Sequence, residues 1–462
     1  MDAFLNWLHH DTAGLLTLCA AGIALLLLMI IRFRIEPFIA LIITGLLIAL
    51  AAGLPVSEIV GSAQSSSDSL LEKGFASILG HITAIVGLGT ILGSLLESSG
   101  GAQLLTRRLL AAFGQNRAPL AMGLSGLLFG IPVFFDIGIF VLAPLVYVAA
   151  RQGGRSILLY CLPLVAGLSM THAFLPPHPG PVVAAGLLGV DLGWVILMGA
   201  ACGIPAFVVS GLLYPAWIGK RIYLPVPDDV LATSEEPEDA PRLSTVAFVI
   251  AVPMVLILCA TFGSILLPKD NGLLQVLTFV GNPTVALTIA VLLAFWLLGL
   301  RRGRTGRELS ELTAASLRPL GMILLVVGAG GFFGKVLSAT GVGDALAGSL
   351  QAGGLPILVS AYVISSGLRI AQGSATVAIV TTGGIVAPLL AGAGYSQPQL
   401  ALIAVAIASG SIIASHVNDG GFWIISRYFG IPVKEMLKTW TVLETVLSLT
   451  GFGMAALLST LV

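Results

Sequence analysis

The chain has 462 residues, of which 57% are apolar and only 10% are charged. Its mean hydropathy of +1.03 excludes an ordinary soluble domain and predicts several membrane spans of about 20 apolar residues. Its 22 basic and 22 acidic residues balance, so no nucleic acid or other polyanion is expected as a partner. Its four cysteines show neither metal-ligand spacing nor a disulfide pattern. We therefore predict an all-α polytopic membrane protein without metal or cofactor.

The first half, residues 13–217, contains apolar runs separated by basic clusters. Arg32 and Arg34 follow the first apolar run. The positive-inside rule therefore places the carboxyl end of this run in the cytoplasm and the N-terminus of the chain outside. A run of 33 residues between basic clusters is too short for two spans and predicts a re-entrant hairpin. The predicted elements are scaffold spans within 13–53, a third span 75–97, a hairpin 118–150, a broken helix 157–181 and a span 194–217.

An acidic, proline-containing stretch predicts a cytoplasmic linker over 218–243. The second half, residues 244–462, has the same order of elements and is expected to end outside. Its predicted elements are scaffold spans within 244–300, a span 319–338, a hairpin 355–393, a broken helix 399–430 and a last span 438–461.

The two halves also share a pattern of glycines. Glycines at 87, 89, 93 and 100 recur at 328, 330, 334 and 341, an offset of 241 residues. The positions of the basic clusters indicate that the third span crosses the membrane inward in the first half and outward in the second half. This indicates two inverted-topology repeats, an arrangement typical of secondary transporters, which hold substrate near the membrane midplane where broken helices meet.

Prolines break the helix in the sequence SMTHAFLPPHPGP, residues 169–181, because each removes a backbone donor and blocks continuation. A break at membrane depth needs protein or a wet cavity to satisfy its backbone groups. Thr171, His172 and His178 flank it, and Ser415 and His416 occupy the corresponding place in SHVNDGG. The three histidines titrate near neutral pH, as a proton-coupled cycle needs, although helix packing is the alternative role for each.

Three charged residues interrupt the apolar hairpins and breaks: Asp136, Arg369 and Asp419. Each costs several kcal/mol at that depth unless paired or hydrated, so a functional role is expected, with a structural ion pair to Arg369 as the alternative. Short polar side chains near helix starts favour a small, hydroxyl-rich anion, and Arg369 would clamp its carboxylate. The predicted substrate-binding residues are Thr171, His172, Arg369, Gln372, Ser374, Thr376 and Asn418, and the predicted proton-coupling residues are Asp136, His178, His416 and Asp419.

The segments SMTHAFLPPHPGP, LRIAQGSATVA, SHVNDGGFW and FFDIGIF resemble the signatures of the gluconate permease (GntP) family of the ion transporter superfamily. The resemblance implies uptake of gluconate or a related sugar acid by proton symport across the bacterial inner membrane. It also implies a homodimer and an elevator-type movement of a transport domain. Two positions depart from the family pattern: Asp136 stands where relatives commonly carry Glu, and Gly421 stands where Pro is expected.

Other functions fit the sequence less well. The motif Gly341-Val342-Gly343-Asp344 spells the GxGD of intramembrane proteases, but no partner carboxylate in a YD pair accompanies it. A zinc enzyme would need HExxH and a third ligand, which the histidines do not supply. An anion channel is the closer alternative. Within the transporter class, sodium coupling and transport of D-serine, glycerate or another small hydroxylated carboxylate stay open.

Overall fold

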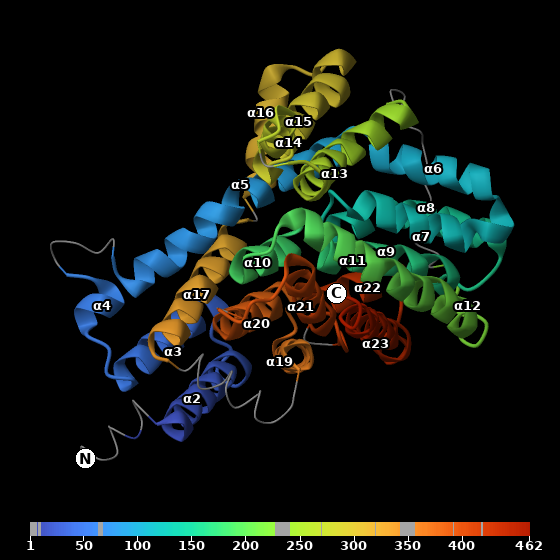
Figure 1. The fold of residues 1–462 in the computed structure, drawn as a ribbon. Coiled ribbons are helices and arrows are strands. Elements are labelled where there is room, and N and C mark those ends of the chain that lie inside the picture. The colour runs from blue at the N-terminus through green and yellow to red at the C-terminus, as the bar shows by residue number, and fades with distance from the viewer. Residues whose placement is uncertain are drawn as a thin grey trace.

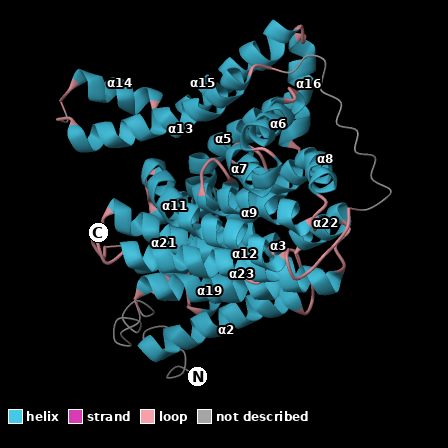
Figure 2. Cartoon of the chain, turned by 90° about the vertical axis from the view of Figure 1, so that its right-hand side faces the viewer, coloured by secondary structure: helices cyan, strands magenta, loops and turns pink. Residues whose placement is uncertain are grey.

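The protein is helical throughout the part of the chain that its computed structural model describes, which is residues 7, 11–62, 68–226, 241–268, 270–318, 320–341, 356–390, 392–416 and 419–462. Figure 2 shows helices joined by loops and no strand in these ranges. Nine helices among the described residues are long and apolar enough to cross a membrane. The predicted class of all-α polytopic membrane protein is therefore confirmed.

The first half begins with two apolar helices and continues through paired shorter ones. A 3-10 turn at Gln115–Arg117 precedes α7, and a π-helical segment at Val208–Leu213 joins α11 to α12. The helices are α2 (Thr12–Ile31), α3 (Pro37–Ala51), α4 (Val56–Val60), α5 (Leu70–Ser98), α6 (Gly101–Phe113), α7 (Ala118–Gly130), α8 (Phe135–Gly153), α9 (Leu158–Phe174), α10 (Pro179–Leu188), α11 (Leu192–Phe207) and α12 (Tyr214–Ile218).

The second half follows residues 227–240 of the predicted linker, which lie outside the described residues. A π-helical segment at Phe295–Gly299 and a 3-10 turn at Leu300–Arg302 extend α15. The helices are α13 (Leu243–Leu266), α14 (Gly272–Val280), α15 (Pro283–Ala294), α16 (Gly306–Leu317), α17 (Leu320–Ala339), α19 (Ile357–Gln372), α20 (Ala375–Leu390), α21 (Gln397–Gly410), α22 (Gly420–Phe429) and α23 (Val433–Leu458).

The proline cluster interrupts the helix between α9 and α10. α9 ends at Phe174, just before Pro176 and Pro177, because the residue before a proline disfavours the helical region. α10 then begins at Pro179, whose fixed backbone angle suits the first helical position. A second break separates α21 from α22. The start of α10 at Pro179 is buried, whereas Gly420 at the start of α22 is exposed.

α9 lies at the centre of the bundle and packs closely on α7. The apolar stretch Leu158–Leu188 is 89% buried. A Cβ atom on Gly126 of α7 would lie 2.2 Å from the carbonyl oxygen of Leu164, so only glycine permits this approach of the two backbones. The close contact fixes the end of α9, which carries His172, against the hairpin formed by α7 and α8.

The order of helices from α5 to α12 resembles the order from α17 to α23, and α5 lies beside α17 in Figure 1. Related glycines have related backbone conformations. Gly100 and Gly341 have φ angles of 76° and 73°, and Gly189 and Gly430 have φ angles of 68° and 63°. The inverted orientation of the halves and the bounds of each half stay predictions.

The helices α13, α14 and α15 project from the main body in Figure 2. Only 28% of the apolar stretch of α13 is buried, and Leu266 at its end is 75% exposed. These apolar faces suit contact with lipid or with another protein chain. The predicted homodimer, in which scaffold helices hold the partner, stays a prediction.

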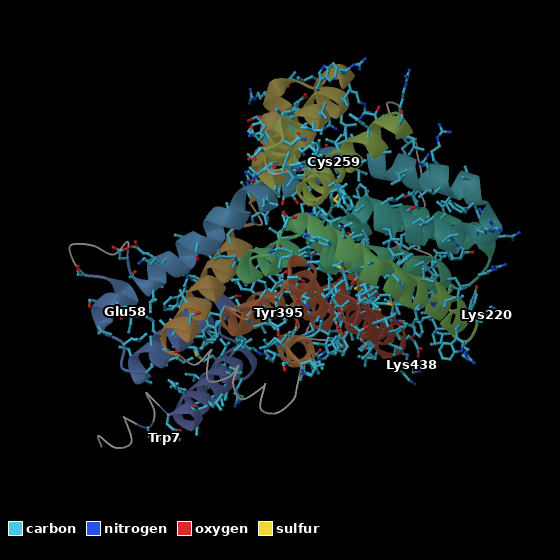
Figure 3. All side chains as sticks on the ribbon, in the orientation of Figure 1. Trp7, Glu58, Lys220, Cys259, Tyr395 and Lys438 are labelled. Carbon is cyan, nitrogen blue, oxygen red and sulfur yellow. The ribbon has the colours of Figure 1, made fainter. Side chains whose placement is uncertain are left out.

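The two predicted sides of the membrane correspond to opposite ends of the molecule. In Figure 3, Glu58 lies at one end, while Lys220 and Lys438 lie at the other. Glu58 belongs to the predicted outer loop, and the two lysines belong to the predicted cytoplasmic side. The orientation of these ends in a bacterial inner membrane, with both chain termini in the periplasm, stays a prediction.

Candidate functional site

A cavity of about 360 Å³ lies where the hairpins and the broken helices meet. This volume is within the range of small-molecule sites, roughly 300–1,000 Å³. Its walls come from the starts of α8, α20 and α22 and from the sides of α9, α19 and α23. The lining residues are Phe134, Phe135, Asp136, Ser169, His172, Arg369, Gly373, Ser374, Ala375, Thr376, Ile412, Asp419, Gly420, Gly421, Trp440 and Glu444.

Three helices present their N-termini to this cavity. α8 begins at Phe135, α20 at Ala375 and α22 at Gly420, and all three residues or their neighbours line the cavity. The Ser374 hydroxyl accepts a hydrogen bond from the N–H of Val377 at 3.4 Å, which caps α20. Since the first N–H groups of a helix carry partial positive charge, three such ends favour an anion between them.

Arg369 is paired with Asp419 across the cavity wall. The guanidinium lies 2.5 Å from a carboxylate oxygen of Asp419, and the side chains are only 5% and 15% exposed. Arg369 also donates to the carbonyl oxygen of Gly373 at the tip of the α19–α20 hairpin. The structure therefore contains the ion pair that the sequence left as an alternative, and this pair ties the hairpin tip to the start of α22.

Asp419 has further partners that fix its orientation. Its side chain accepts from the N–H of Gly421 at 3.0 Å and from the hydroxyl of Ser415. The indole N–H of Trp440 donates to the Ser415 oxygen at 2.8 Å. A proline at position 421 would lack the donor to Asp419, so the departure from the family pattern has a structural consequence.

The two histidines of the first break lie beside each other. Their ring centroids are 4.8 Å apart. His172 lines the cavity, and its Nδ1 has no hydrogen-bond partner within the described part of the chain. His178 is 3% exposed, and its Nε2 lies 2.5 Å from the carbonyl oxygen of Gly130, so it lies behind the cavity wall. The Nδ1 of His172 is thus buried without a described partner, on a side chain that lines the cavity.

The structure brings together six of the predicted residues and leaves three aside. Asp136, His172, Arg369, Ser374, Thr376 and Asp419 line the cavity. The Thr171 hydroxyl donates to the carbonyl oxygens of Gly167 and Leu168, both at 3.0 Å. The Nδ1 of His416 lies 2.9 Å from the carbonyl oxygen of Ala414. These two residues and His178 do not line it. Asn418, the side chain of Gln372, and Asp344 of the GxGD match lie outside the described residues.

Sequence reasoning missed three polar residues of the cavity: Ser169, Trp440 and Glu444. Glu444 is 2% exposed, its Oε1 has no hydrogen-bond partner among the described residues, and it lines the cavity together with Ser169. The sequence did contain a signal for Glu444, because it is an acidic residue within the apolar run 438–461. In the described residues no group of three or more His, Cys, Asp or Glu side chains has a metal-binding arrangement.

Comparison with known proteins agrees with this architecture. Two solved transporters share the fold at 17% sequence identity. The YdaH transporter of Alcanivorax borkumensis has a TM-score of 0.62, with 92% of this chain and 98% of that chain covered. MtrF of Neisseria gonorrhoeae, described as one of a class of antimetabolite efflux pumps, has a TM-score of 0.60, with 93% of this chain and 96% of that chain covered. These likenesses show the fold alone, which is that of a multi-pass helical membrane protein.

Sequence comparison gives the family. The model of the GntP family permeases matches residues 14–462, and the chain belongs to this family. It is 42% identical to the inner membrane permease YgbN of Escherichia coli, with 96% of this chain and 98% of the relative covered. It is 39% identical to a gluconate permease of Pseudomonas aeruginosa, with 98% and 99% covered. It is 36% identical to the L-idonate transporter of the Gnt-II system of Escherichia coli, with 94% and 97% covered.

Proposed function

We propose that this permease imports gluconate or a related sugar acid by proton symport across the bacterial inner membrane. The observation that carries the proposal is the convergence of three helix N-termini and Arg369 on one cavity. Such ends attract a carboxylate, and an arginine adds a directional donor pair. Family relatives named for gluconate and L-idonate support a sugar acid as the substrate.

In the proposed binding mode the substrate carboxylate lies at the start of α20. Ser374 and Thr376 line the cavity there, next to Arg369. The hydroxyl groups of the sugar chain then extend toward His172 and Ser169 on α9. Polyhydroxylated carboxylates need several donors and acceptors on both sides of the chain, and this wall of the cavity offers both.

Charge balance supports proton coupling. The cavity has three carboxyl groups, on Asp136, Asp419 and Glu444, and one described cation, Arg369, which pairs with Asp419. A substrate carboxylate would add another negative charge next to two unpaired acids, and like charges in a buried site repel strongly. If Asp136 or Glu444 takes up a proton, this repulsion is removed and the loaded domain carries less charge past lipid. We therefore propose these two acids as proton carriers beside Asp419, His178 and His416.

The same acidic excess favours one second candidate. A zwitterionic amino acid such as D-serine brings an ammonium group, which Asp136 or Glu444 would neutralise without a proton. Glycerate, by contrast, has the same charge as gluconate and differs only in length. Sodium would balance the acids as a proton does. These alternatives differ in the ion that drives uptake and in the competing substrate.

We also propose that the cavity moves with its hairpins and broken helices in an elevator-like manner within a homodimer. The cavity lining comes from α8, α9, α19, α20, α22 and α23 and the segments next to them, whereas α2, α3 and α13 to α15 contribute no lining residue among those described. This division suits a mobile transport domain and a static scaffold. Cysteine cross-linking between the two groups of helices, expected to block uptake without preventing binding, tests it.

Uptake of labelled gluconate into proteoliposomes tests the function. A pH gradient, acid outside, is imposed with and without sodium, and L-idonate, D-serine and glycerate compete in separate runs. Accumulation that needs the pH gradient, ignores sodium and is inhibited by L-idonate supports the proposal. Accumulation abolished by D-serine alone, or driven by a sodium gradient, contradicts the sugar acid or the proton respectively. Equilibration without accumulation under any gradient indicates a channel.

A further inference from the structure

A second cavity, of about 690 Å³, lies away from the transport site at the end of the molecule that carries Lys220. It has basic residues at its rim and apolar residues at its floor. The rim includes Arg117, Arg155 and Lys220, and the floor includes Leu159, Pro163 and Leu212. None of the proposed transport steps uses this cavity.

The three basic residues come from separate parts of the chain. Arg117 precedes α7, Arg155 lies between α8 and α9, and Lys220 follows α12. The positive-inside rule predicts that basic residues flanking apolar spans lie on the cytoplasmic side, and these three surround one cavity. All three are exposed, and none forms an ion pair with another described residue. Three positive charges around a concave surface, without an ion-pair partner in the described part of the chain, attract an anion.

The rim has a fixed geometry, because backbone and hydroxyl contacts hold the segment after α12 against the start of α9. The Ser156 hydroxyl donates to the carbonyl oxygen of Ile222 at 2.9 Å and accepts from the N–H of Leu224 at 3.1 Å. The N–H of Ile157 donates to the carbonyl oxygen of Leu224 at 3.0 Å. Lys220 and Tyr223 therefore sit on an anchored segment beside Arg155.

Aromatic residues place this rim at the level of lipid head groups. Trp217 is 51% exposed and Tyr223 is 67% exposed. The guanidinium of Arg221 lies 3.9 Å above the Trp217 ring. Exposed tryptophan and tyrosine beside lysine and arginine mark the membrane interface, where one side of a ring is apolar and the other is wet.

The floor of the cavity extends from this rim toward the membrane interior. Leu159 and Pro163 lie on successive turns of α9, and Leu212 lies on the π-helical segment. From Leu159 to Pro163 the helix rises about 6 Å at 1.5 Å per residue. A molecule that fits this cavity therefore has an anionic end and an apolar chain.

We propose that this cavity binds an anionic phospholipid. The phosphodiester lies between Arg117, Arg155 and Lys220, and one acyl chain runs along Leu159 and Leu212. Basic pockets between membrane helices on the cytoplasmic side bind anionic head groups in this way. A lipid held there bridges the α7–α8 hairpin to α12, and so stabilises the folded protein.

Thermal unfolding of the full-length purified protein in detergent tests the proposal. Phosphatidylglycerol, phosphatidylcholine and glycerol 3-phosphate are added in separate titrations. We expect phosphatidylglycerol to raise Tm by about 5 °C at saturation, and the other two to leave it unchanged. Native mass spectrometry should show one retained phosphatidylglycerol per chain.

Three variants test the location of the site. The triple variant R117Q/R155Q/K220Q should lose the phosphatidylglycerol shift, while the matched triple R32Q/R34Q/R307Q, with three exposed arginines elsewhere, should keep it. If the first triple does not fold, A216W tests the same point, because Ala216 lines the cavity and an indole there obstructs it without changing charge. An equal shift with phosphatidylcholine, an equal shift with glycerol 3-phosphate, or an unchanged shift in A216W would each overturn the proposal.

Discussion

The guanidinium of Arg369 lies 2.5 Å from the carboxylate of Asp419, so one buried contact connects the tip of the α19–α20 hairpin to the N-terminus of α22. Ser415 and Trp440 extend this contact to α23 through hydrogen bonds. The pair lies in the wall of the cavity, where a substrate carboxylate would compete with Asp419 for the guanidinium. The same contact therefore has a structural role and, in the proposed mechanism, a binding role.

Breaking this pair should affect stability and transport together. Arg369→Gln leaves Asp419 as a buried, unpaired charge, which costs about 3–5 kcal/mol. We expect a lower Tm and no gluconate uptake. The double variant R369Q/D419N removes both charges and should recover most of the stability, but not the uptake. If the double variant transports gluconate at the rate of the natural chain, Arg369 has no part in substrate binding.

Glu444→Gln should separate substrate exchange from proton-driven accumulation. The amide keeps the shape of a protonated carboxyl group, so binding and counterflow exchange should persist, whereas a pH gradient should no longer drive accumulation. Glu435→Gln is the matched control, because Glu435 lies on the same helix but pairs with Lys438 at 3.2 Å near the surface. Full accumulation in Glu444→Gln would exclude Glu444 from the coupling mechanism. Asp136 would then be the next candidate, and Asp136→Asn is the corresponding test.

A new acid at the start of α20 should weaken substrate binding without weakening the helix. Thr376→Asp places a carboxylate in the first turn, where it suits the helix dipole but repels a substrate carboxylate. We expect the Kd for gluconate to rise at least about tenfold, or about 1.4 kcal/mol, with Tm unchanged. Gly306→Asp adds an acid to the first turn of α16, outside the cavity, and should leave Kd unchanged. If Thr376→Asp binds gluconate with unaltered affinity, the substrate carboxylate does not lie at the start of α20.

The packing of α7 on α9 should not tolerate even one added methyl group. Gly126→Ala would bring a Cβ to 2.2 Å from the backbone oxygen of Leu164, and backbone atoms cannot move aside as a flexible side chain does. We expect a loss of roughly 1–3 kcal/mol or more and poor recovery of folded protein on size-exclusion chromatography. At Gly453 on α23 nothing lies within 4 Å of an added Cβ, so Gly453→Ala should behave as the natural chain. Equal recovery of both variants would contradict the close approach of the two helices.

Much of this protein follows from local features of its sequence. Apolar runs and prolines set the spans and the helix break before Pro179, since hydrophobicity and the missing proline donor act on the chain wherever it lies. The charges of Asp136, Arg369 and Asp419 could be identified from the sequence because they interrupt apolar segments. All three residues line the cavity. What each of these residues does in transport stays a prediction.

Tertiary structure alone decided which of these residues meet. The pairing of Arg369 with Asp419 rather than Asp136, and the entry of Glu444 into the cavity, depend on how α19, α22 and α23 pack, which no local pattern encodes. The hydroxyl of Thr171 is directed to its own helix backbone, and the ring of His178 is directed to the carbonyl oxygen of Gly130 at the end of α7. The sequence by itself determined where charge and helix breaks occur along the chain. Long-range packing determined which of them share one cavity, because contacts between distant segments form only when the whole bundle folds.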